Sequence, residues 1–374
     1  MALPFRLACF YFAHFAYGGA FVAYLPLYLA WRGLQPGEIA WVLALPQLAR
    51  TFAPAAWGWV ADRSGAQRGI VAFSCAAMAA GFGMLPYTQG VVSISWVIGV
   101  VSLLSAGALP LVEAVTLGAL AGQAGRYGPI RLWGSVGFIA MVLAGGAWLE
   151  RRSVDLLPPA MTLCALAALA AALGLPSRSA HAAPPAARLR FGPAAKALLA
   201  AGFCMAAAHG TLYTFLTLHL ERAGYGGTMI GLLWTLGVLA EIAVFLYLPA
   251  LFRRYSLSGI LVFSFACAAL RFAAIGWGAD FLWILVPAQL LHAATFGSFH
   301  AASVAAVHRV FPTEAHGRGQ ALFSGICYGG GGGAGALMAG WAWEAAGPGL
   351  AFSLSALAAV AGAFLALRLR RAGL

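Results

Sequence analysis

Four charged side chains lie inside long apolar stretches of this sequence, where each needs a partner or a function. They are Arg50, Glu113, Glu241 and Arg271. A charge at the centre of a membrane-spanning helix costs roughly 2.5–3.5 kcal/mol on insertion scales, so such residues mark ligand sites or proton relays. With Arg131 the set holds three positive and two negative charges, and one excess positive charge suits a monoanionic ligand.

Arg50 is placed deep in its apolar stretch. It precedes Asp62, at the end of that stretch, by 12 residues. At 1.5 Å per residue this is about 18 Å from the helix end, near the middle of a bilayer. A guanidinium at that depth needs an acceptor. Two interpretations are open: a permanent ion pair with a carboxylate of another helix, or a substrate.

Neutral polar and aromatic residues accompany these charges. His14, Tyr17 and His209 could bind a substrate, and each could equally make a contact between helices. Further aromatic residues could line a cavity or could simply pack: Tyr24, Trp133, Phe138, Tyr213 and Trp234. No set of metal ligands and no Ser-His-Asp order stands at a plausible spacing. We therefore predict no metal, no cofactor and no catalytic residue.

The composition defines the environment of these residues. Hydrophobic residues make up 62% of the 374 residues and charged residues 9%, whereas a soluble domain is about a quarter charged. The net charge of +12 comes from basic residues in short loops, as the positive-inside rule predicts. Nucleic acid is therefore not an expected partner. The six cysteines stand singly within apolar runs, without a C-x-x-C spacing, so the sequence indicates neither a disulfide framework nor a zinc site.

We predict an all-α membrane protein with twelve spanning helices, since each apolar run reaches the roughly 20 residues that a bilayer requires. The expected spans are approximately 5–31, 37–60, 69–87, 91–119, 130–149, 157–175, 194–221, 228–252, 259–278, 281–310, 318–344 and 348–368. With both termini in the cytoplasm, 16 Lys and Arg residues fall inside and 4 outside, which fixes that orientation.

A segment rich in Pro, Ser, Ala and Arg divides the spans six and six. It covers 176–193 and is typical of a cytoplasmic linker. The predicted domains are thus an N-terminal bundle, 1–175, and a C-terminal bundle, 194–374. Two related halves with a site between them near the midplane are the usual plan of a transporter.

A run of glycines from Gly329 to Gly333 falls within the span 318–344. It is not a phosphate-binding loop, because no Gly-Lys-Ser/Thr sequence follows. Small residues allow membrane helices to approach closely, and consecutive glycines also weaken a helix. Close packing and a flexible gate are both compatible with this run.

The loop from Gly58 to Arg68 reads Gly-Trp-Val-Ala-Asp-Arg-Ser-Gly-Ala-Gln-Arg. Its glycine at position 65 permits a tight reversal. The pattern resembles the loop between the second and third helices of major facilitator superfamily transporters. In that family the Asp and Arg pair with the neighbouring half and help close one end of the transport path. The resemblance implies a gating role for Gly58, Asp62, Arg63, Gly65 and Arg68.

Longer stretches resemble the phenylpropionate permease branch of that superfamily. They are Tyr127-Gly-Pro-Ile-Arg131-Leu-Trp-Gly-Ser-Val, the run from Gly231 to Glu241, and Gln289 to Ala302. The likeness covers nearly the whole chain. It implies an aromatic carboxylate as the substrate, such as 3-phenylpropionate. The polar half of its site would consist of Arg50, His14 and the pair Glu113 and Arg131.

The chain also resembles lactose permease, whose Glu and Arg at the spacing of Glu113 and Arg131 form the core of a sugar site. Arg271 and His292 match its coupling arginine and histidine. Its proton-carrying carboxylate, however, is replaced here by Thr295. We therefore expect Glu241 to carry the coupling proton, with Arg271 and His292 tuning it. The alternative is a static Glu–Arg pair.

These features predict a secondary active transporter of the cell membrane, working as a monomer by alternating access between two bundles. It would import a small organic solute, an aromatic carboxylate, together with a proton. A sugar or nucleoside symporter is the nearest alternative, and a non-transporting membrane sensor is another. A membrane-embedded enzyme would need a catalytic constellation, which the sequence lacks.

Overall fold

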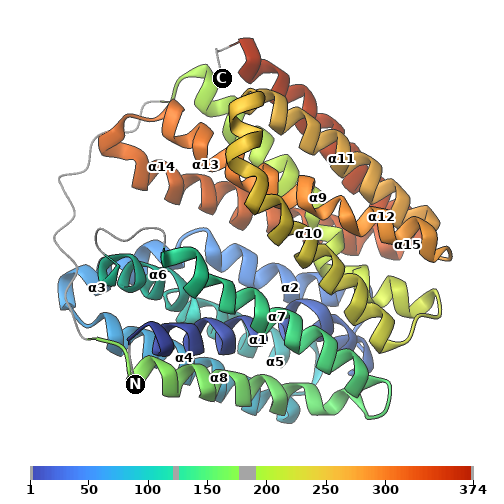
Figure 1. Ribbon diagram of the computed structural model, residues 1–374. Coiled ribbons are helices and arrows are strands. Elements are labelled where there is room, and N and C mark those ends of the chain that lie inside the picture. Colours follow the sequence, from blue (N-terminus) through green and yellow to red (C-terminus); the bar gives the residue numbers. More distant parts are fainter. Residues whose placement is uncertain (1–2, 121–125, 177–190, 372–374) are drawn as a thin grey trace. The chain divides into compact units, whose positions relative to one another are not determined.

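The computed structural model describes residues 3–120, 126–176 and 191–371, and every regular element in them is helical (Figure 1). Within these described ranges, ten segments are long and apolar enough to cross a membrane. The longest, Thr313–Arg370, contains two predicted spans. One further predicted span, 37–60, is present as two shorter helices, α2 and α3.

The chain folds into two compact units, which we call unit 1 and unit 2. Unit 1 comprises Met1–Leu34, Phe52–Ala182 and Gly226–Gly231, and unit 2 comprises Gln35–Thr51, Ala183–Tyr225 and Leu232–Leu374. Each unit therefore includes a short segment of the other sequence half. Most of the predicted linker, 176–193, lies outside the described residues, and the predicted bundle boundaries stay a prediction.

Unit 1 is built around α1, which packs along α7 and α8, while α4 packs on α8 and α5. Glycines allow these close approaches: a side chain on Gly137 of α7 would collide with the backbone of Phe12 on α1. The elements of unit 1 are α1 (Leu3–Trp31), α3 (Ala53–Ser64), α4 (Gln67–Met84), η1 (Leu85–Tyr87), α5 (Gly90–Ser105), α6 (Ala108–Ala119), α7 (Tyr127–Leu149), η3 (Val154–Leu156) and α8 (Leu157–Leu173).

Unit 2 is built around α9, which is the most buried of the spanning helices and packs along α15. Its elements are α2 (Pro36–Arg50), α9 (Pro193–Arg222), α10 (Gly227–Arg254), α11 (Leu257–Gly278), α12 (Leu282–Leu290), η4 (Ala293–Ser298), α13 (Phe299–Val310), η5 (Thr313–Ala315), α14 (His316–Phe323), η6 (Ser324–Gly331) and α15 (Gly332–Arg371). The first residues of α10, to Gly231, belong to unit 1.

The helix predicted at 37–60 is interrupted. α2 ends at Arg50, Thr51 and Phe52 form a turn, and α3 begins at Ala53. Pro54 is the physical cause, since proline has no N–H to donate and its ring clashes with the carbonyl four residues earlier, here that of Arg50. The break leaves Arg50 at the carboxyl end of a helix rather than in its middle.

Two elements of unit 2 are π-helical, η4 and η6. Such segments are rare and occur frequently at functional sites. η6 includes the start of the glycine run, and a Cβ added to Gly325 or Gly329 would collide with the backbone of Thr51. The glycines therefore permit a backbone contact between η6 and the end of α2, which supports the close-packing interpretation.

α15 contains the break between the last two predicted spans. Ala346 and Gly347 have non-helical backbone angles, with a φ of 77° at Gly347, and Pro348 follows. A glycine at positive φ followed by proline is a common helix stop. The predicted spans 318–344 and 348–368 are thus separate helices.

The loop predicted to reverse at Gly65 does so. Gly65 ends α3 with a φ of 65°, in the left-handed region, and α4 begins at Gln67. Asp62, Arg63 and Arg68 are exposed, and the Arg63 guanidinium lies 4.3 Å from the centre of the Trp59 ring. The geometry of this loop agrees with the sequence, while its role as a gate stays a prediction.

Two helix starts are capped by glutamates. In unit 2 the backbone N–H of Gly37, at the start of α2, donates to Glu344 at 2.8 Å. In unit 1 Glu150 accepts from the Thr228 backbone N–H at 3.0 Å and from its hydroxyl at 2.5 Å. The hydrogen bonds from Thr228 lower the pKa of the Glu150 carboxyl below its ordinary value. Carboxylates at a helix N-terminus also interact favourably with its dipole.

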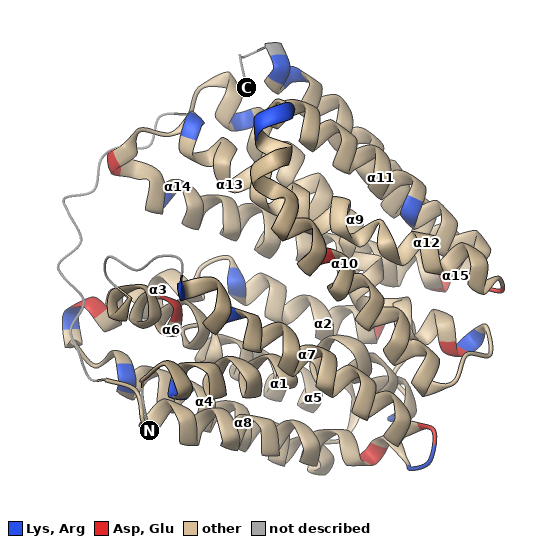
Figure 2. Ribbon diagram, viewed as in Figure 1, with Lys and Arg blue, Asp and Glu red and all other residues tan. Residues whose placement is uncertain are grey.

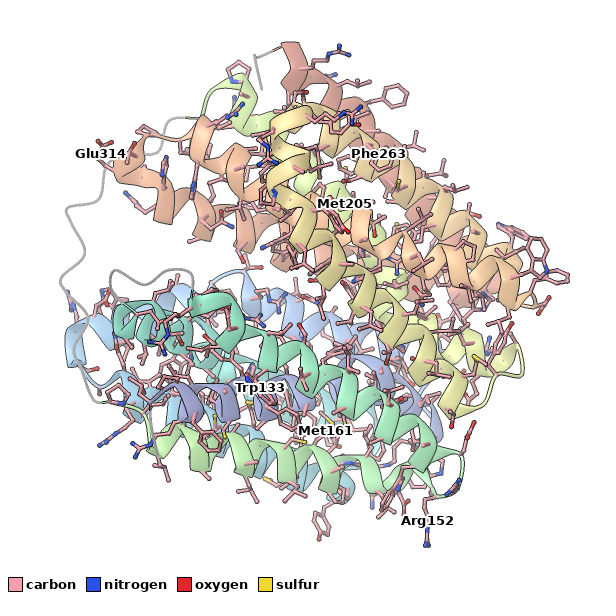
Figure 3. All side chains as sticks on the ribbon, viewed as in Figure 1. Trp133, Arg152, Met161, Met205, Phe263 and Glu314 are labelled. Atoms are coloured by element: carbon pink, nitrogen blue, oxygen red, sulfur yellow. The ribbon has the colours of Figure 1, made fainter. Side chains whose placement is uncertain are left out.

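The outer surfaces are apolar. Two of the residues labelled in Figure 3 illustrate this: Met161 of α8 is 0% exposed, whereas Phe263 of α11 is 62% exposed. Trp96, Trp283 and Leu246 are exposed by 71%, 71% and 78%. Apolar faces of this extent mark contact with a membrane, and Figure 2 shows most charged residues near helix ends. The chain is a multi-pass membrane protein.

Candidate functional site

Unit 2 holds a buried arginine in a shell of neutral groups. Arg271 of α11 is 1% exposed. One of its terminal nitrogens donates to His292 Nδ1 at 3.0 Å and to Thr295 Oγ1 at 3.0 Å. The other donates to Gln289 Oε1 at 2.8 Å. The three acceptors come from the α12–η4 segment, so the π-helical turn at η4 forms one wall of this shell.

This shell fixes the protonation of His292. A guanidinium has donors only, so His292 Nδ1 must accept, and the ring hydrogen resides on Nε2 while that bond exists. His292 Nε2 lies 3.6 Å from Glu241 Oε2. His292 is therefore a neutral imidazole that separates the Arg271 guanidinium from the Glu241 carboxylate.

The approach of Glu241 depends on a glycine. Glu241 lies on α10, and a Cβ added to Gly297 of η4 would come within 2.6 Å of Val244 Cγ1 and 3.4 Å of Glu241 Cγ. Without a side chain at Gly297, α10 and η4 pack closely. That contact places the Glu241 carboxylate beside His292.

Arg50, at the end of α2, forms the second charged position of unit 2. Its side chain is exposed. Among the described residues we find no acidic side chain paired with it, whereas the hydroxyls of Tyr213 and Tyr328 lie within electrostatic range. The sequence left open a permanent ion pair between Arg50 and a carboxylate of another helix. No carboxylate among the described residues forms this pair, so the Arg50 guanidinium is available to an anion.

His209 and Tyr213 follow one another on α9. His209 is 4% exposed, and its Nδ1 lies 2.9 Å from the Met205 carbonyl of the same helix. Its ring stacks on Tyr213 with 5.8 Å between centroids, and Tyr213 stacks on Trp234 at 6.5 Å. The hydrogen bond of His209 is thus within its own helix, while its ring meets Phe272 of α11 edge-on at 5.1 Å.

Tyr213 is a residue that sequence reasoning placed only among possible cavity-lining aromatics. Its hydroxyl lies within electrostatic range of Arg50, Glu241 and Arg271. The Tyr213 side chain is half-buried. Its position four residues after His209, on the same face of α9, was the one available signal.

Unit 1 holds a direct ion pair. Arg131 of α7 and Glu113 of α6 are 3.5 Å apart, with side-chain exposures of 29% and 35%. The Arg131 guanidinium also lies over the Phe15 ring at 4.1 Å and the Tyr11 ring at 5.4 Å. Glu113 and Arg131 are thus in direct contact, and the guanidinium packs against two aromatic rings.

The two predicted site residues of α1 lie among aromatic rings. His14 stacks on Phe10 with 5.5 Å between centroids, and Arg131 lies within electrostatic range of it. Tyr17 meets Phe82 edge-on at 5.3 Å. His14 thus accompanies the Glu113–Arg131 pair, while Tyr17 packs against its aromatic neighbours.

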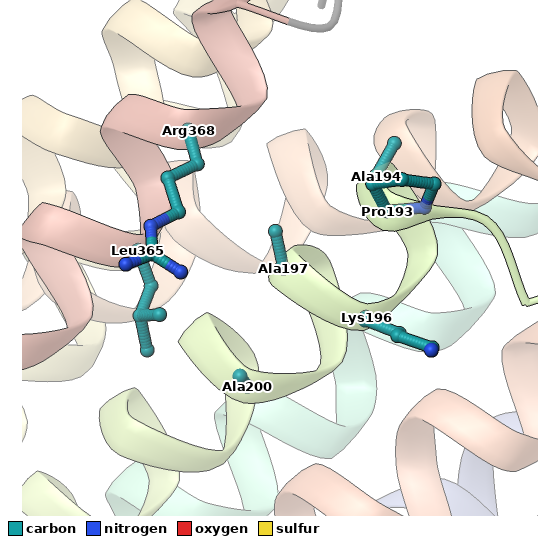
Figure 4. A pocket seen from close by; sticks show the side chains of 7 residues that line it. All are labelled: Pro193, Ala194, Lys196, Ala197, Ala200, Leu365 and Arg368. Atoms are coloured by element: carbon teal, nitrogen blue, oxygen red, sulfur yellow. The ribbon is translucent and has the colours of Figure 1, made fainter.

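A surface groove of about 380 Å³ lies elsewhere in unit 2, between the start of α9 and the end of α15 (Figure 4). Lys196 and Arg368 contribute its positive charge, and alanines and Leu365 its apolar wall. The groove contains none of the predicted site residues. Within the described residues, no three His, Cys, Asp or Glu side chains gather as metal ligands.

Comparison with known proteins assigns the chain to a family. The model described as "MFS_1 like family" matches residues 5–354. A probable 3-phenylpropionic acid transporter of Escherichia coli (strain K12) is 28% identical over 370 residues, which is 96% of this chain and 96% of that protein. A maltose permease of Geobacillus stearothermophilus is 32% identical over 169 residues, covering 45% of this chain and 43% of the permease.

Solved structures agree on the fold. The crystal structure of the nucleoside transporter NupG superposes with a TM-score of 0.81 at 19% identity, over 99% of each chain. A POT family transporter in complex with a thioalcohol-conjugated peptide superposes with a TM-score of 0.74 at 10% identity, over 98% of this chain and 94% of the other. At these identities the likeness concerns the fold alone.

Proposed function

The chain belongs to the MFS_1-like family of major facilitator transporters, and we propose that it imports a small aromatic carboxylate together with a proton. It is a secondary transporter rather than an enzyme. In this proposal it works as a monomer in the cell membrane, with both termini in the cytoplasm. The observation that carries the proposal is the arrangement of Glu241, His292 and Arg271.

Proton coupling requires a carboxylate that can be both ionised and neutral during the transport cycle. A guanidinium in direct contact would hold a carboxylate ionised. Glu241 instead faces the Nε2–H of a neutral His292, 3.6 Å away. A neutral imidazole N–H at this distance acts on the carboxylate as a dipole and exerts no full charge on it. Glu241 can therefore take up and release a proton while Arg271 keeps its own neutral acceptors.

Recognition of a carboxylate rests on Arg50. It has no acidic partner among the described residues, and the hydroxyls of Tyr213 and Tyr328 lie within electrostatic range of it. A planar guanidinium binds a carboxylate with two parallel hydrogen bonds. The stacked rings of Tyr213 and Trp234 supply an apolar surface for the remainder of an aromatic acid. The similarity to the probable 3-phenylpropionic acid transporter of Escherichia coli supports this substrate class.

We assign the remaining predicted residues to the substrate path. In unit 1 Glu113, Arg131 and His14 would offer polar groups and Tyr17 an aromatic ring to the solute, and in unit 2 His209 would offer a further polar group. The loop residues Asp62, Arg63 and Arg68 keep their proposed gating role. These assignments rest on residue type and on the family resemblance, and substitution of each residue tests them.

A sugar or nucleoside symporter is the second candidate. The partial likeness to a maltose permease and the direct Glu113–Arg131 pair favour it. A neutral polyol needs a carboxylate and an arginine to bind its hydroxyls, but it does not need an unpaired Arg50. The two candidates therefore differ in which residue is indispensable.

Uptake into proteoliposomes tests this choice. Purified protein, with an imposed inward proton gradient, is offered labelled 3-phenylpropionate, maltose or a nucleoside. We expect accumulation of the aromatic acid, loss of its binding in Arg50→Ala, and residual binding in Glu113→Gln. Accumulation of the sugar or nucleoside, insensitive to Arg50→Ala and abolished by Glu113→Gln, contradicts the proposal.

A further inference from the structure

The end of α2 is in backbone contact with η6. Thr51, the residue after Arg50, lies against Gly325 and Gly329, where a Cβ would collide with its backbone. Tyr328 immediately precedes Gly329 in η6 and is half-buried. The glycine contact therefore brings the tyrosine-bearing turn of η6 alongside the end of α2. Arg50 and the Tyr328 hydroxyl are within electrostatic range as a result.

A histidine of a different helix holds the hydroxyl of Tyr328. His300 Nδ1, on α13, lies 2.9 Å from the Tyr328 hydroxyl oxygen. The two rings are 6.2 Å apart, and the Phe323 ring meets Tyr328 edge-on at 5.8 Å. Contacts from α13 and α14 thus restrict the phenol ring. A side chain held this way can serve recognition, because little of its rotational freedom remains to be lost on binding.

We propose that Tyr328 is a second carboxylate-recognition residue, which donates its hydroxyl hydrogen to the same carboxylate that Arg50 binds, and that His300 positions it. The inference rests on the proposed function, which it deepens by naming how the acid is distinguished from its neutral analogues. It assigns Tyr328 and His300, neither of which the sequence singled out for substrate binding.

The location of the hydrogen between His300 Nδ1 and the Tyr328 hydroxyl defines the roles of the two residues. When His300 Nδ1 carries a hydrogen it donates to the phenol oxygen, and the phenol O–H is then free to donate to the ligand. When Nδ1 is bare, the phenol donates to His300 instead. A carboxylate accepts hydrogen bonds only, so its binding selects the first tautomer. No covalent step is involved, and Tyr328 keeps its proton throughout.

This arrangement discriminates by charge and by acceptor strength. A carboxylate receives charge-assisted hydrogen bonds from Arg50 and from Tyr328, which are roughly twice as strong as neutral ones. An alcohol of the same shape receives only weak neutral bonds. Removing the Tyr328 hydroxyl should therefore weaken binding of the acid and leave binding of the alcohol nearly unchanged.

The test measures binding of 3-phenylpropionate and of 3-phenylpropanol to purified protein by isothermal titration. We expect Tyr328→Phe to raise the Kd of the acid roughly 10-fold or more, the size expected for a lost hydrogen bond to a charged group. The Kd of the alcohol should stay within about twofold. Tyr247→Phe is the matched control, since Tyr247 is 69% exposed in the same unit, and it should change neither value.

A second variant keeps the test decisive if Tyr328→Phe fails to fold. His300→Gln retains an N–H donor for the phenol, while His300→Ala removes it. We expect the acid's Kd to rise more in His300→Ala than in His300→Gln, a rescue that a merely structural role for His300 does not predict. Equal losses of acid and alcohol binding in both variants overturn the positioning role.

The outcomes distinguish failure of the Tyr328 inference from failure of the proposed function. If the wild type binds the acid and Arg50→Ala weakens it, yet Tyr328→Phe binds it as the wild type does, the inference is overturned and the proposed function stands. If the wild type binds neither ligand but binds maltose or a nucleoside, the proposed function fails and this inference fails with it.

Discussion

The two units differ in how a carboxylate meets an arginine. In unit 1 Glu113 and Arg131 are in direct contact at 3.5 Å, and both side chains are partly exposed. In unit 2 Glu241 and Arg271 are separated by His292, which bonds the arginine at 3.0 Å and faces the glutamate at 3.6 Å. The first arrangement is a closed ion pair, whereas the second leaves a carboxylate beside a neutral ring.

The difference suggests different tasks. A direct pair satisfies both charges and changes little when a solute arrives or leaves. A carboxylate that is separated from an arginine by a neutral imidazole can be neutralised by a proton without breaking an ion pair with that arginine. Unit 2 is therefore where we expect proton exchange, beside the Arg50 contact to the carboxylate, and unit 1 is where we expect only further polar contacts to the solute.

The largest effect should come from removing the buried arginine. Arg271→Leu leaves Gln289, His292 and Thr295 without their donor, at about 1–3 kcal/mol for each buried acceptor left unpaired. We expect a large drop in Tm in detergent and no accumulation in proteoliposomes. Arg253→Gln, at an exposed position, is the control and should keep the wild-type Tm and the accumulation. Retention of accumulation by Arg271→Leu would remove the contrast between the units.

A smaller effect should follow from a single methyl group in η6. Gly329→Ala forces a Cβ onto the Thr51 backbone, while Gly330→Ala meets nothing closer than Phe203 at 3.6 Å. We expect Gly329→Ala to destabilise the protein by about 1–3 kcal/mol, as overpacking does, and to weaken carboxylate binding at Arg50. Thermal unfolding and ligand titration of the two variants measure the difference. Equal behaviour of the pair contradicts the contact between η6 and α2.

Breaking the direct Glu113–Arg131 pair should have a smaller effect on binding. Partly exposed ion pairs contribute roughly 0.2–1 kcal/mol, so Glu113→Gln should change the Kd of an aromatic carboxylate by at most about fivefold. Coupling to protons should persist, because Glu241 is untouched. Uptake with and without a pH gradient checks both points. Loss of proton coupling in Glu113→Gln would contradict the assignment of proton exchange to Glu241 alone.

The smallest effect concerns the helix caps and depends on pH. Because folding lowers the pKa of Glu150, its contribution to stability is present above the ordinary carboxyl pKa and is lost as pH falls through the lowered value. We expect the Tm of the wild type to approach that of Glu150→Gln as pH falls from 7 towards about 3. A constant Tm difference over this range contradicts the cap.

Much of the fold was predictable from sequence because membrane helices are long and apolar. The spans, the reversal at Gly65 and the stop before Pro348 all follow from local rules. Pro54 also encodes the interruption after Arg50. The sequence pattern nevertheless predicts one continuous helix, because the residues on both sides of the break are apolar. The π-helical turns of η4 and η6 carry no comparable signal, since their hydrogen bonding is set by packing against neighbouring helices.

The site was predictable in part. Charges in apolar runs singled out Arg50, Glu241 and Arg271 as candidates, because intramembrane charges are rare, and their roles stay predictions. Tyr213 and Tyr328 could not be distinguished from the other aromatic residues of membrane helices. The tautomer of His292 was also beyond the sequence, because it depends on which ring nitrogen the Arg271 guanidinium reaches.

The most direct test of the central claim compares uphill accumulation with exchange in Glu241→Gln. Proteoliposomes containing the variant are given labelled 3-phenylpropionate, either under an inward proton gradient or with unlabelled acid inside. If Glu241 carries the proton, accumulation is lost while exchange across the membrane continues. If the variant still concentrates the acid against its gradient, Glu241 is not the proton carrier and the account is wrong.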